Sequence, residues 1–458
     1  MPRITPGAVK GTRDYLPRDL VLRNRVFAQL RETFERYGYE PLETPTIERT
    51  DVLEGKYGEE GEKLLFRILR RGRDLDEGVA KLVAATDRGT GAATRLLSDE
   101  ALRYDLTVPF ARVVALYQNE LQMPFRRYQI QPVWRADRPQ KGRFREFYQC
   151  DVDCVGSTSV SIEAEMLAMA NQVLERLGFE EFTIRINHRA LLGALMASEG
   201  VPAGLTSATL VAIDKLDKIG PAGVRADLAT AGLEDVVAQR VMAAISITGK
   251  PAEVVARLRA ETQLGSDLAG DAALRDLEAV FGYLAALGVP ETRYSFDVST
   301  VRGLSYYTGL IFETVAPGAP VGSLCSGGRY DRLIGQFTGR DLPCTGISFG
   351  IDRIFTAMEI LGLGETDTTT ATQALVSTLG AANVGASFAV AQALRAAGIR
   401  TEVYADETRA LKGQLSFAAK KGIPLLAIVG DDERQAQRVT LRDLRTGQQE
   451  TLSMDNAV

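Results

Sequence analysis

A basic and aromatic stretch between Arg126 and Asp153 constrains this chain more than any other part of its sequence. From Arg126 to Glu146 it holds seven basic residues and two acidic ones, although the whole protein has a formal net charge of -5. An apolar-rich run, a polar loop with Pro139 and Gly142, and a second run with alternating aromatic residues predict an antiparallel β-hairpin. Two strands that end in arginines and are joined by a basic loop form a cradle for phosphate groups. A solvated basic hairpin is the simpler alternative.

The second half of this stretch carries side chains suited to a nucleotide. Arg135 and Arg145 offer planar guanidinium groups for bidentate contacts with phosphate oxygens. Phe147 offers a ring on which a purine can stack. The strand then closes with polar residues that an ordinary surface strand does not need, namely Gln149, Asp151 and Asp153. We therefore favour a binding site over a solvated surface.

The stretch resembles the second signature motif of class II aminoacyl-tRNA synthetases, and its run RPQKGRFREFYQ is similar to the histidyl-tRNA synthetase family. The resemblance implies an α+β catalytic domain with an antiparallel sheet, a helical insertion and a C-terminal α/β anticodon-binding domain. The implied boundaries are residues 1–190 and 291–361 for the catalytic domain, 191–290 for the insertion and 371–458 for the last domain.

Composition is that of an ordinary globular protein. The 458 residues are 45% hydrophobic and 25% charged, which predicts two or three domains. The N-terminus has no apolar signal region, and no run of about 18 uncharged apolar residues occurs, so we expect neither secretion nor a membrane span. A cytoplasmic location is the default expectation.

Cysteine and histidine are too sparse for a metal site. The four cysteines are scattered, and we expect buried free thiols rather than disulfides or zinc ligands. His188 is the only histidine of the chain, and it stands where a strand is expected to enter a helix. We interpret it as a turn or capping residue, with no metal bound.

The run LRYDLTVPFARVVA contains the next candidate site residues. By resemblance, Asp105, Leu106 and Thr107 belong to the histidine site, and Asp105 and Thr107 hold the amino group of the amino acid. The same residues also predict a helix start, with Thr107 as N-cap and Pro109 near the first turn. Both interpretations are compatible if capping leaves the Asp105 carboxylate free.

Several segments are predicted from periodicity or composition. Apolar spacing predicts helices over residues 21–37 and 161–177, and residues 182–186 read as a strand. Residues 70–99 show no clear period and resemble a long mobile insertion near the site. The run YEPLETPTIERTDVL resembles the first class II motif, which implies a homodimer, although a proline-broken edge strand explains it equally well.

The stretch of residues 191–290 is Ala-rich and mostly helical in pattern. In the histidyl family an inserted helical domain stands at this point and approaches the acceptor arm of the tRNA. A purely structural insertion is the alternative, and the residues do not decide between the two.

Arginine, glycine and paired tyrosines return in the run YSFDVSTVRGLSYYTGLIFE. It matches the RGLDYY signature of the histidyl family, with Ser305 in place of the usual acid. In the following run CSGGRYDRL, Gly327 and Gly328 are expected to let backbone approach a ligand. The run TGISFGIDRIF resembles the third class II motif, a strand entering a helix whose Arg353 packs against ATP.

The C-terminal part begins after a Gly/Thr/Asp linker at residues 362–372. Alternating strand and helix patterns predict a small α/β domain with parallel strands, as a flavodoxin-like regulatory domain would also show. The run LKGQLSFAAKKGIPLLAIVG resembles the anticodon-binding domain shared by several class II synthetases. Ten basic residues face nine acidic ones from Ala371 on, so attraction of phosphate must be local.

The resemblance as a whole implies a histidine–tRNA ligase that uses ATP with magnesium. Its partners would be histidine, ATP, histidine tRNA and a second copy of the chain, with no membrane. Arg302 and Arg135 are the implied catalytic residues. The implied histidine site is Asp105, Leu106, Thr107, Arg135, Gln149, Asp153, Arg302, Tyr306, Tyr307 and Tyr330, and the implied ATP site is Arg135, Asp137, Arg143, Arg145, Phe147 and Arg353.

Two alternatives remain from the sequence. One is the synthetase-like regulatory subunit of ATP phosphoribosyltransferase, which generally lacks an anticodon-type domain. The other is a different class II synthetase, such as a threonyl or prolyl enzyme, against which Asp153 and the run RGLSYY argue.

Overall fold

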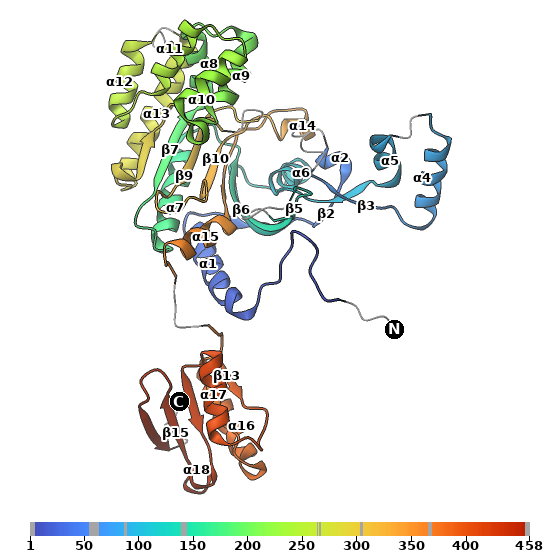
Figure 1. The fold of residues 1–458 in the computed structure, drawn as a ribbon, viewed down its shortest axis with the longest axis vertical. Helices are drawn as coiled ribbons and strands as arrows, with labels where there is room; N and C mark the ends of the chain where they lie inside the picture. Colours follow the sequence, from blue (N-terminus) through green and yellow to red (C-terminus); the bar gives the residue numbers. More distant parts are fainter. Residues whose placement is uncertain are drawn as a thin grey trace. The chain divides into compact units, whose positions relative to one another are not determined.

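The computed structural model describes residues 5–54, 64–86, 89–138, 144–262, 264, 267–302, 306–364 and 369–453. The chain forms two compact units, one of Met1–Arg13 with Gln29–Leu363 and one of Asp14–Ala28 with Gly364–Val458. Figure 1 shows the elements of each unit. The two units are described separately below.

The first unit is built on an eight-stranded sheet. Its order is β1 (Glu40–Pro41), β5 (Phe125–Trp134), β6 (Glu146–Val155), β11 (Cys344–Phe349), β10 (Cys325–Arg329), β9 (Leu310–Val315), β7 (Thr183–His188) and β8 (Tyr294–Phe296). The six central strands are antiparallel, whereas β1 and β8 add parallel pairs at the two edges. The predicted antiparallel sheet is therefore confirmed. The short proline-containing run at Pro41 forms an edge strand, where a missing N–H costs no ladder bond.

The predicted hairpin is the longest pairing of this sheet. Strands β5 and β6 pair in register from Phe125 opposite Val155 to Trp134 opposite Glu146. Because side chains alternate between the two faces of a strand, Gln149, Asp151 and Asp153 share one face. The polar end of the hairpin thereby becomes a row of three polar side chains.

Helices cover the sheet and fix its central strands. From Gln29 on, α1 (Pro17–Arg36) belongs to the first unit, and the ring of Phe34 lies 5.5 Å from those of Tyr128 and Phe349. The predicted helix at residues 161–177 is α7 (Ser161–Arg176). The strand and helix of the third motif are β11 and α15 (Ile351–Ile360), as expected.

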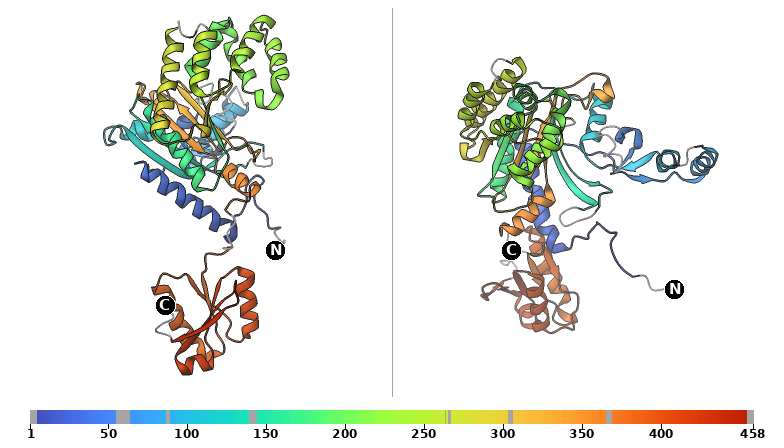
Figure 2. Two further views of the ribbon diagram at one scale, coloured as in Figure 1. Left: turned by 90° about the vertical axis from the view of Figure 1, so that its left-hand side faces the viewer. Right: turned by 45° about the horizontal axis from the view of Figure 1, so that its top comes forward.

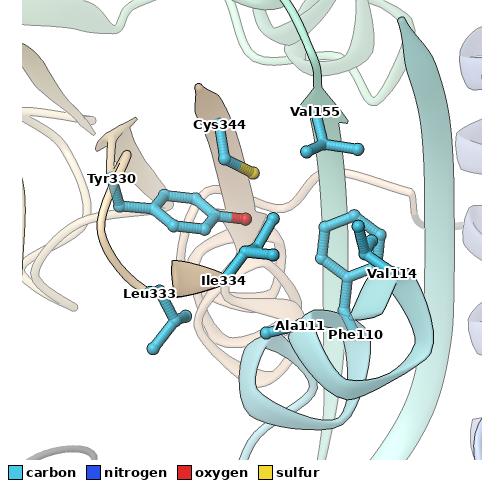
Figure 3. Close-up of a cluster of buried hydrophobic side chains, with 8 residues drawn as sticks. All are labelled: Phe110, Ala111, Val114, Val155, Tyr330, Leu333, Ile334 and Cys344. Atoms are coloured by element: carbon cyan, nitrogen blue, oxygen red, sulfur yellow. The ribbon is translucent and has the colours of Figure 1, made fainter. Parts of the chain in front are cut away.

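A buried apolar cluster lies between helix α6 (Thr107–Tyr117) and the strands β6 and β11. Its members are Phe110, Ala111, Val114, Val155, Tyr330, Leu333, Ile334 and Cys344 (Figure 3). Tyr306 and Tyr307 pack against this cluster. Burial of these side chains stabilises the unit and fixes the tyrosines that enter the site.

Residues 64–99 have more regular structure than their sequence predicted. Strand β3 (Phe66–Ile68) leads into α4 (Gly72–Ala84) and α5 (Thr90–Leu97), which pack on each other. Strand β4 (Glu100–Leu102) then pairs with β3 and with β2 (Ile47–Arg49), which precedes α2 (Thr50–Leu53). The interpretation of this segment as lacking a helical period was therefore wrong: α4 is amphipathic, with Leu75, Gly78 and Leu82 as its less exposed positions, and α5 is mostly half-buried.

The expected helical insertion is present. It consists of α8 (Arg189–Ser198), α9 (Thr206–Ile213), α10 (Leu216–Thr230), α11 (Asp235–Ile245), α12 (Pro251–Glu261) and α13 (Leu268–Ala286). These helices gather beside β7 and β9, green to yellow in both figures of the whole chain (Figures 1 and 2). Helix α13 packs against α7 and α8, and its contact with α7 attaches the insertion to the rest of the first unit. As predicted, His188 caps a helix: its Nδ1 accepts the N–H of Ala190 at 3.2 Å.

The second unit contains a five-stranded mixed sheet. Its order is β13 (Thr401–Val403), β12 (Ala374–Val376), β14 (Leu425–Ile428), β15 (Arg438–Asp443) and β16 (Gln449–Ser453), with helices α16 (Val384–Ala396), α17 (Leu411–Lys421) and α18 (Asp431–Ala436). The first three strands are parallel, as predicted, but β15 and β16 pair antiparallel. The predicted parallel strands are therefore confirmed, and β15 and β16 extend the sheet by antiparallel pairing, which needs no crossover helix.

No helix among the described residues is long and apolar enough to cross a membrane.

Candidate active site

A cavity of about 580 Å³ opens over the antiparallel strands of the first unit. It collects residues that lie far apart in the sequence, from Leu64 to Arg353. Eleven of the predicted site residues line it: Asp105, Thr107, Arg135, Asp137, Phe147, Gln149, Asp153, Tyr306, Tyr307, Tyr330 and Arg353. The order of motifs along the chain thus predicts one site in space.

Strand β6 forms the cavity floor, by which we mean Gln149, Asp151 and Asp153. The Asp153 carboxylate makes an ion pair with Arg127 at 2.7 Å, and the exposed fractions of the two side chains are 5% and 0%. The Tyr330 hydroxyl donates to Asp153 Oδ1, and Ser348 Oγ donates to Asp151 Oδ1 at 2.5 Å. The two carboxylates of the floor are therefore already bound by protein side chains before any substrate enters.

Burial governs the ionisation of this floor. Desolvation raises the pKa of Asp153, while the charge of Arg127 and the Tyr330 hydroxyl lower it. Desolvation likewise raises the pKa of Asp151, to about 7, against the opposing effect of Arg127. The two neighbouring carboxylates therefore differ in setting, since Asp153 has the direct ion pair and Asp151 does not.

Glycines on the neighbouring strands leave the space that this network and the nearby aromatic rings occupy. A Cβ on Gly346, which pairs with Asp153 across β11 and β6, would collide with the Asp153 carboxylate. Gly328 gives similar room to the ring of Tyr307, and Gly327 to the side chain of Phe312. Neither Gly327 nor Gly328 lines the cavity, so the expectation that they let backbone approach a ligand was wrong. They serve packing between strands and aromatic rings.

Three tyrosines form one wall of the cavity. The rings of Tyr306 and Tyr307 lie 4.2 Å apart, and that of Tyr306 lies 6.2 Å from Tyr330 in an edge-on arrangement. Burial raises the pKa of Tyr307 to about 12 and that of Tyr306 well above its ordinary value. The hydroxyls therefore stay protonated at neutral pH and serve as hydrogen-bond groups.

The start of helix α6 differs from the expected cap. Its N-cap residue is Leu106, and the N–H of Val108 donates to Asp105 Oδ1 at 3.3 Å. Thr107 is the first helical residue rather than the N-cap, and the Asp105 carboxylate is not left free by capping. Both side chains still line the cavity, whereas Leu106 is fully buried and does not.

Another part of the site gathers cations and an aromatic ring, namely Arg135, Arg145, Phe147 and Arg353; we name this set the nucleotide wall after the ligand that the sequence predicts for it. The Arg135 guanidinium lies 5.0 Å from the Phe147 ring centre, and its Nε donates to the Tyr104 carbonyl at 2.9 Å. Arg353 Nη1 donates to the Ser323 carbonyl at 3.2 Å. Arg145 does not itself line the cavity, and its Nε donates to the carbonyl of Asp137 at 3.2 Å.

An N-terminal arginine that the sequence did not single out reaches the same wall. Arg13 Nη2 lies 2.7 Å from Asp352 Oδ1, and its guanidinium lies 4.3 Å from the Phe144 ring centre. Asp352 and Phe144 both line the cavity. No periodicity or motif marks Arg13, so only the fold reveals that it joins the hairpin to helix α15.

Arg302 lies beside the cavity rather than in its lining. Its Nη2 donates to Ser323 Oγ at 2.9 Å and is paired with the buried carboxylate of Glu313. Ser323 lines the cavity and also accepts the hydrogen bond of Arg353 at its carbonyl. Ser323 is therefore bonded both to Arg302 and to Arg353, a member of the nucleotide wall. The predicted residues Arg143 and Ser305 lie outside the described residues.

The cysteines of the first unit include one that lines the cavity, Cys325. All four cysteines are free and buried, as expected, and burial raises the pKa of Cys325 to about 12. Within the described parts of the chain, no group of three or more His, Cys, Asp or Glu side chains could hold a metal ion.

Comparisons with known proteins agree with the geometry. The family model described as histidyl-tRNA synthetase matches residues 11–78 and 77–354, and the one described as anticodon binding domain matches residues 373–458. Histidine–tRNA ligase from Gloeobacter violaceus is 42% identical over 98% of this chain and 97% of its own length.

Solved structures show the same fold. Histidyl-tRNA synthetase from Nostoc sp. has a TM-score of 0.86 at 31% identity, covering 99% of this chain and 98% of its own. An ATP phosphoribosyltransferase regulatory subunit/histidyl-tRNA synthetase from Bacillus halodurans has a TM-score of 0.72 at 23% identity, over 91% and 97% of the two chains, which shows the fold alone. The cavity, the motifs and these matches together establish that the chain belongs to the histidyl-tRNA synthetase family of class II aminoacyl-tRNA synthetases.

Proposed function

We propose that this chain is a histidine–tRNA ligase that activates histidine with ATP and transfers it to the 3′ end of its tRNA. The observation that carries the proposal is the joint cavity, in which a buried acidic floor faces arginines and an aromatic ring. The acidic floor suits a cationic amino acid, and the nucleotide wall suits a polyphosphate with a purine. Full-length similarity to histidine–tRNA ligases supports the same activity.

Histidine is recognised through the floor and the tyrosines in this proposal. Asp153 and Tyr306 bond the imidazole, and Asp105, Thr107 and Gln149 hold the amino group. Arg127 supports Asp153 by keeping a compensating charge 2.7 Å away. A site built on buried polar groups rejects apolar amino acids by roughly 10⁴ or more, because those groups would be left unpaired.

ATP binds along the nucleotide wall, with Arg135 on the α-phosphate and Phe147 and Arg353 around the adenine. Arg145 and Asp137 lie at the phosphate end, where Arg145 is held by the Asp137 carbonyl. Magnesium enters as part of the ATP substrate and neutralises phosphate charge. Tyr307 and Tyr330, on the tyrosine side of the cavity, keep water away from histidine in this proposal.

Activation requires positioning rather than a general base. A histidine carboxylate oxygen forms a bond to the α-phosphorus, and the bond from that phosphorus to the oxygen of the β-phosphate breaks, so that pyrophosphate leaves. The carboxylate is already a nucleophile, and the developing phosphate charge is what needs stabilisation. Arg135 and Arg302 supply that charge. A ribose hydroxyl of the terminal tRNA nucleotide then takes the histidyl group, releasing AMP.

Domain roles and assembly follow from the family. We infer that residues 1–190 and 291–361 carry the chemistry, residues 191–290 approach the acceptor arm, and residues 371–458 read the anticodon. We also infer a homodimer, formed through the motif at residues 39–53, and a cytoplasmic location. Light scattering that shows a stable active monomer at assay concentration would contradict the dimer.

The decisive experiment is pyrophosphate exchange with each of the twenty amino acids. Histidine alone should support exchange above background, and purified histidine tRNA should then be charged. Exchange with threonine or proline in place of histidine would refute the proposal. No exchange with any amino acid would favour the regulatory-subunit alternative, which the full-length matches to histidine–tRNA ligases do not favour.

A further inference from the structure

Asp151 is the one side chain of the cavity floor to which the proposed function gives no role. It lies between Gln149 and Asp153 on the same face of β6, it lines the cavity, and it is only 3% exposed. It accepts a hydrogen bond from Ser348 Oγ, which lies directly across from it on the neighbouring strand β11. A buried carboxylate placed in a substrate cavity with one neutral hydroxyl as donor is costly unless a cation joins it or it binds a proton.

The charges around Asp151 come from every element packed against it. On its own strand lies Asp153, on β5 lies Arg127, and at the start of α6 lies Asp105. Ser348 faces it from β11. Tyr306 and Tyr307 approach it from the segment before β9, and the charge of Asp151 raises the pKa of both phenols. The buried carboxylates of Asp151 and Asp153 thus share one fully buried arginine, and that arginine is directly paired with Asp153.

This imbalance is what a cationic substrate would correct. The α-ammonium group of an amino acid carries one positive charge and three N–H donors, and it must be desolvated to reach the floor. We propose that Asp151 is a further histidine-binding residue that is protonated in the empty site and gives up its proton to solvent as the substrate's ammonium group enters. The inference rests on the proposed function, because it takes histidine as the occupant of the cavity.

A purely structural Asp151 would behave differently. If it only completed the hydrogen bond with Ser348, it would keep its proton when histidine binds, and asparagine would replace it without loss. In contrast, a carboxylate that ionises on binding links histidine affinity to pH. Because the pKa of Asp151 is raised to about 7, close to half of the molecules would carry the proton at pH 7.

The test is calorimetric titration of the full chain with histidine at pH 7, in two buffers of different ionisation enthalpy. The difference between the buffers gives the protons released. The unmutated protein should release about half a proton more than Asp151→Asn, and the imidazole of histidine contributes equally to both. The variant should also bind histidine about tenfold more weakly.

Two further variants keep the result interpretable. Asp151→Glu retains the carboxyl group and should restore proton release. Ser348→Ala removes the donor to the carboxylate, which raises its pKa further, and should move the pH midpoint of proton release upward.

Proton release that is equal in the unmutated protein and Asp151→Asn, with histidine still bound by both, overturns the role of Asp151. A failure of the unmutated protein to bind histidine at all overturns the proposed function instead. Should Asp151→Asn not fold, the shift expected for Ser348→Ala decides the question, and an unshifted midpoint counts against the proposal.

Discussion

The cavity floor and the nucleotide wall both carry charge, but they hold it in different ways. The floor carboxylate of Asp153 is paired with Arg127, which is fully buried on the neighbouring strand β5. On the wall, Arg135 and Arg145 are only partly buried, and among the described residues neither makes an ion pair; their Nε atoms donate to backbone carbonyls and their guanidinium groups face Phe147 and Phe66.

The difference separates recognition from charge stabilisation. A charge that is already paired inside the protein is fixed in place and defines a shape, which serves discrimination between amino acids. A cation held by neutral partners keeps most of its charge for a phosphate that arrives later. The predictions below test this contrast, beginning with the largest expected effect.

Removing the buried cation should cost more stability than removing any exposed one. In Arg127→Met the Asp153 carboxylate would remain buried without its partner, and we expect a loss of about 3 to 5 kcal/mol in the free energy of unfolding. The matched control is Arg259→Met, which breaks an ion pair with Glu278 on the helical insertion and should cost less than about 1 kcal/mol. If the two variants lost the same free energy of unfolding in urea, the buried ion pair under the floor would stabilise the protein no more than an exposed one.

The floor should also dominate the pH dependence of stability. The folded-state pKa of Asp151 is raised to about 7 from about 3.9 in an unfolded chain, so folding binds a proton more tightly. Its contribution to stability is therefore complete below about pH 4 and is lost as the pH rises to about 7. Relative to the unmutated protein, Asp151→Asn should gain stability over that window, by roughly 4 kcal/mol at most. Melting temperatures measured from pH 4.5 to 8 check this, and a constant difference would contradict it.

Arg302 is an exception to this contrast, because it is paired with Glu313 and yet is proposed to act on the phosphate; it also donates to Ser323, whose carbonyl accepts from Arg353. If Arg302 stabilises the α-phosphate as charge develops, Arg302→Ala should slow histidine-dependent pyrophosphate exchange by roughly 10² to 10³. The control is Arg185→Ala, because Arg185 lies 3.8 Å from the same carboxylate of Glu313 but donates to Asp217 instead of Ser323. A parental rate in Arg302→Ala, with tRNA binding intact, would make Arg302 structural.

The smallest effect is expected from Arg13, which contacts cavity residues from the N-terminal segment. Arg13 is partly exposed, and its ion pair with Asp352 holds Phe144 against the start of helix α15. We expect Arg13→Ala to raise the KM for ATP by up to about fivefold, with the KM for histidine unchanged. Arg49→Ala, which breaks another exposed ion pair, should change neither constant. If Arg13→Ala changed only the KM for histidine, Arg13 would act on the histidine site rather than on the ATP site.

Much of this arrangement was predictable because it depends on local patterns. The alternation in β5 and β6 predicted the hairpin and put Gln149, Asp151 and Asp153 on one face. The motif residues Arg135, Phe147 and Arg353 were expected together and do line one cavity. Helical spacing likewise predicted α1 and α7 within a few residues of their ends.

What escaped prediction depends on partners distant in sequence. Arg127 looked like one more basic residue of the hairpin, and only its position opposite Asp153 in the register shows that it is buried. Gly346 is needed because Asp153 lies across from it, and nothing near Gly346 in the sequence indicates this. Helices α4 and α5 were missed because a composition rich in Gly, Arg, Asp and Ala masked the helical spacing of Leu75, Gly78 and Leu82.

The separation of floor and wall is tested most directly by measuring two Michaelis constants in two variants. Pyrophosphate exchange should be followed in Asp153→Asn and Arg353→Ala, with histidine and ATP varied in turn while the other substrate is saturating, after circular dichroism has shown that both variants fold. We expect Asp153→Asn to raise the KM for histidine by about tenfold or more with little change for ATP, and Arg353→Ala to show the reverse. Variants that raise both constants equally, or Asp153→Asn with an unchanged histidine dependence, would contradict the account.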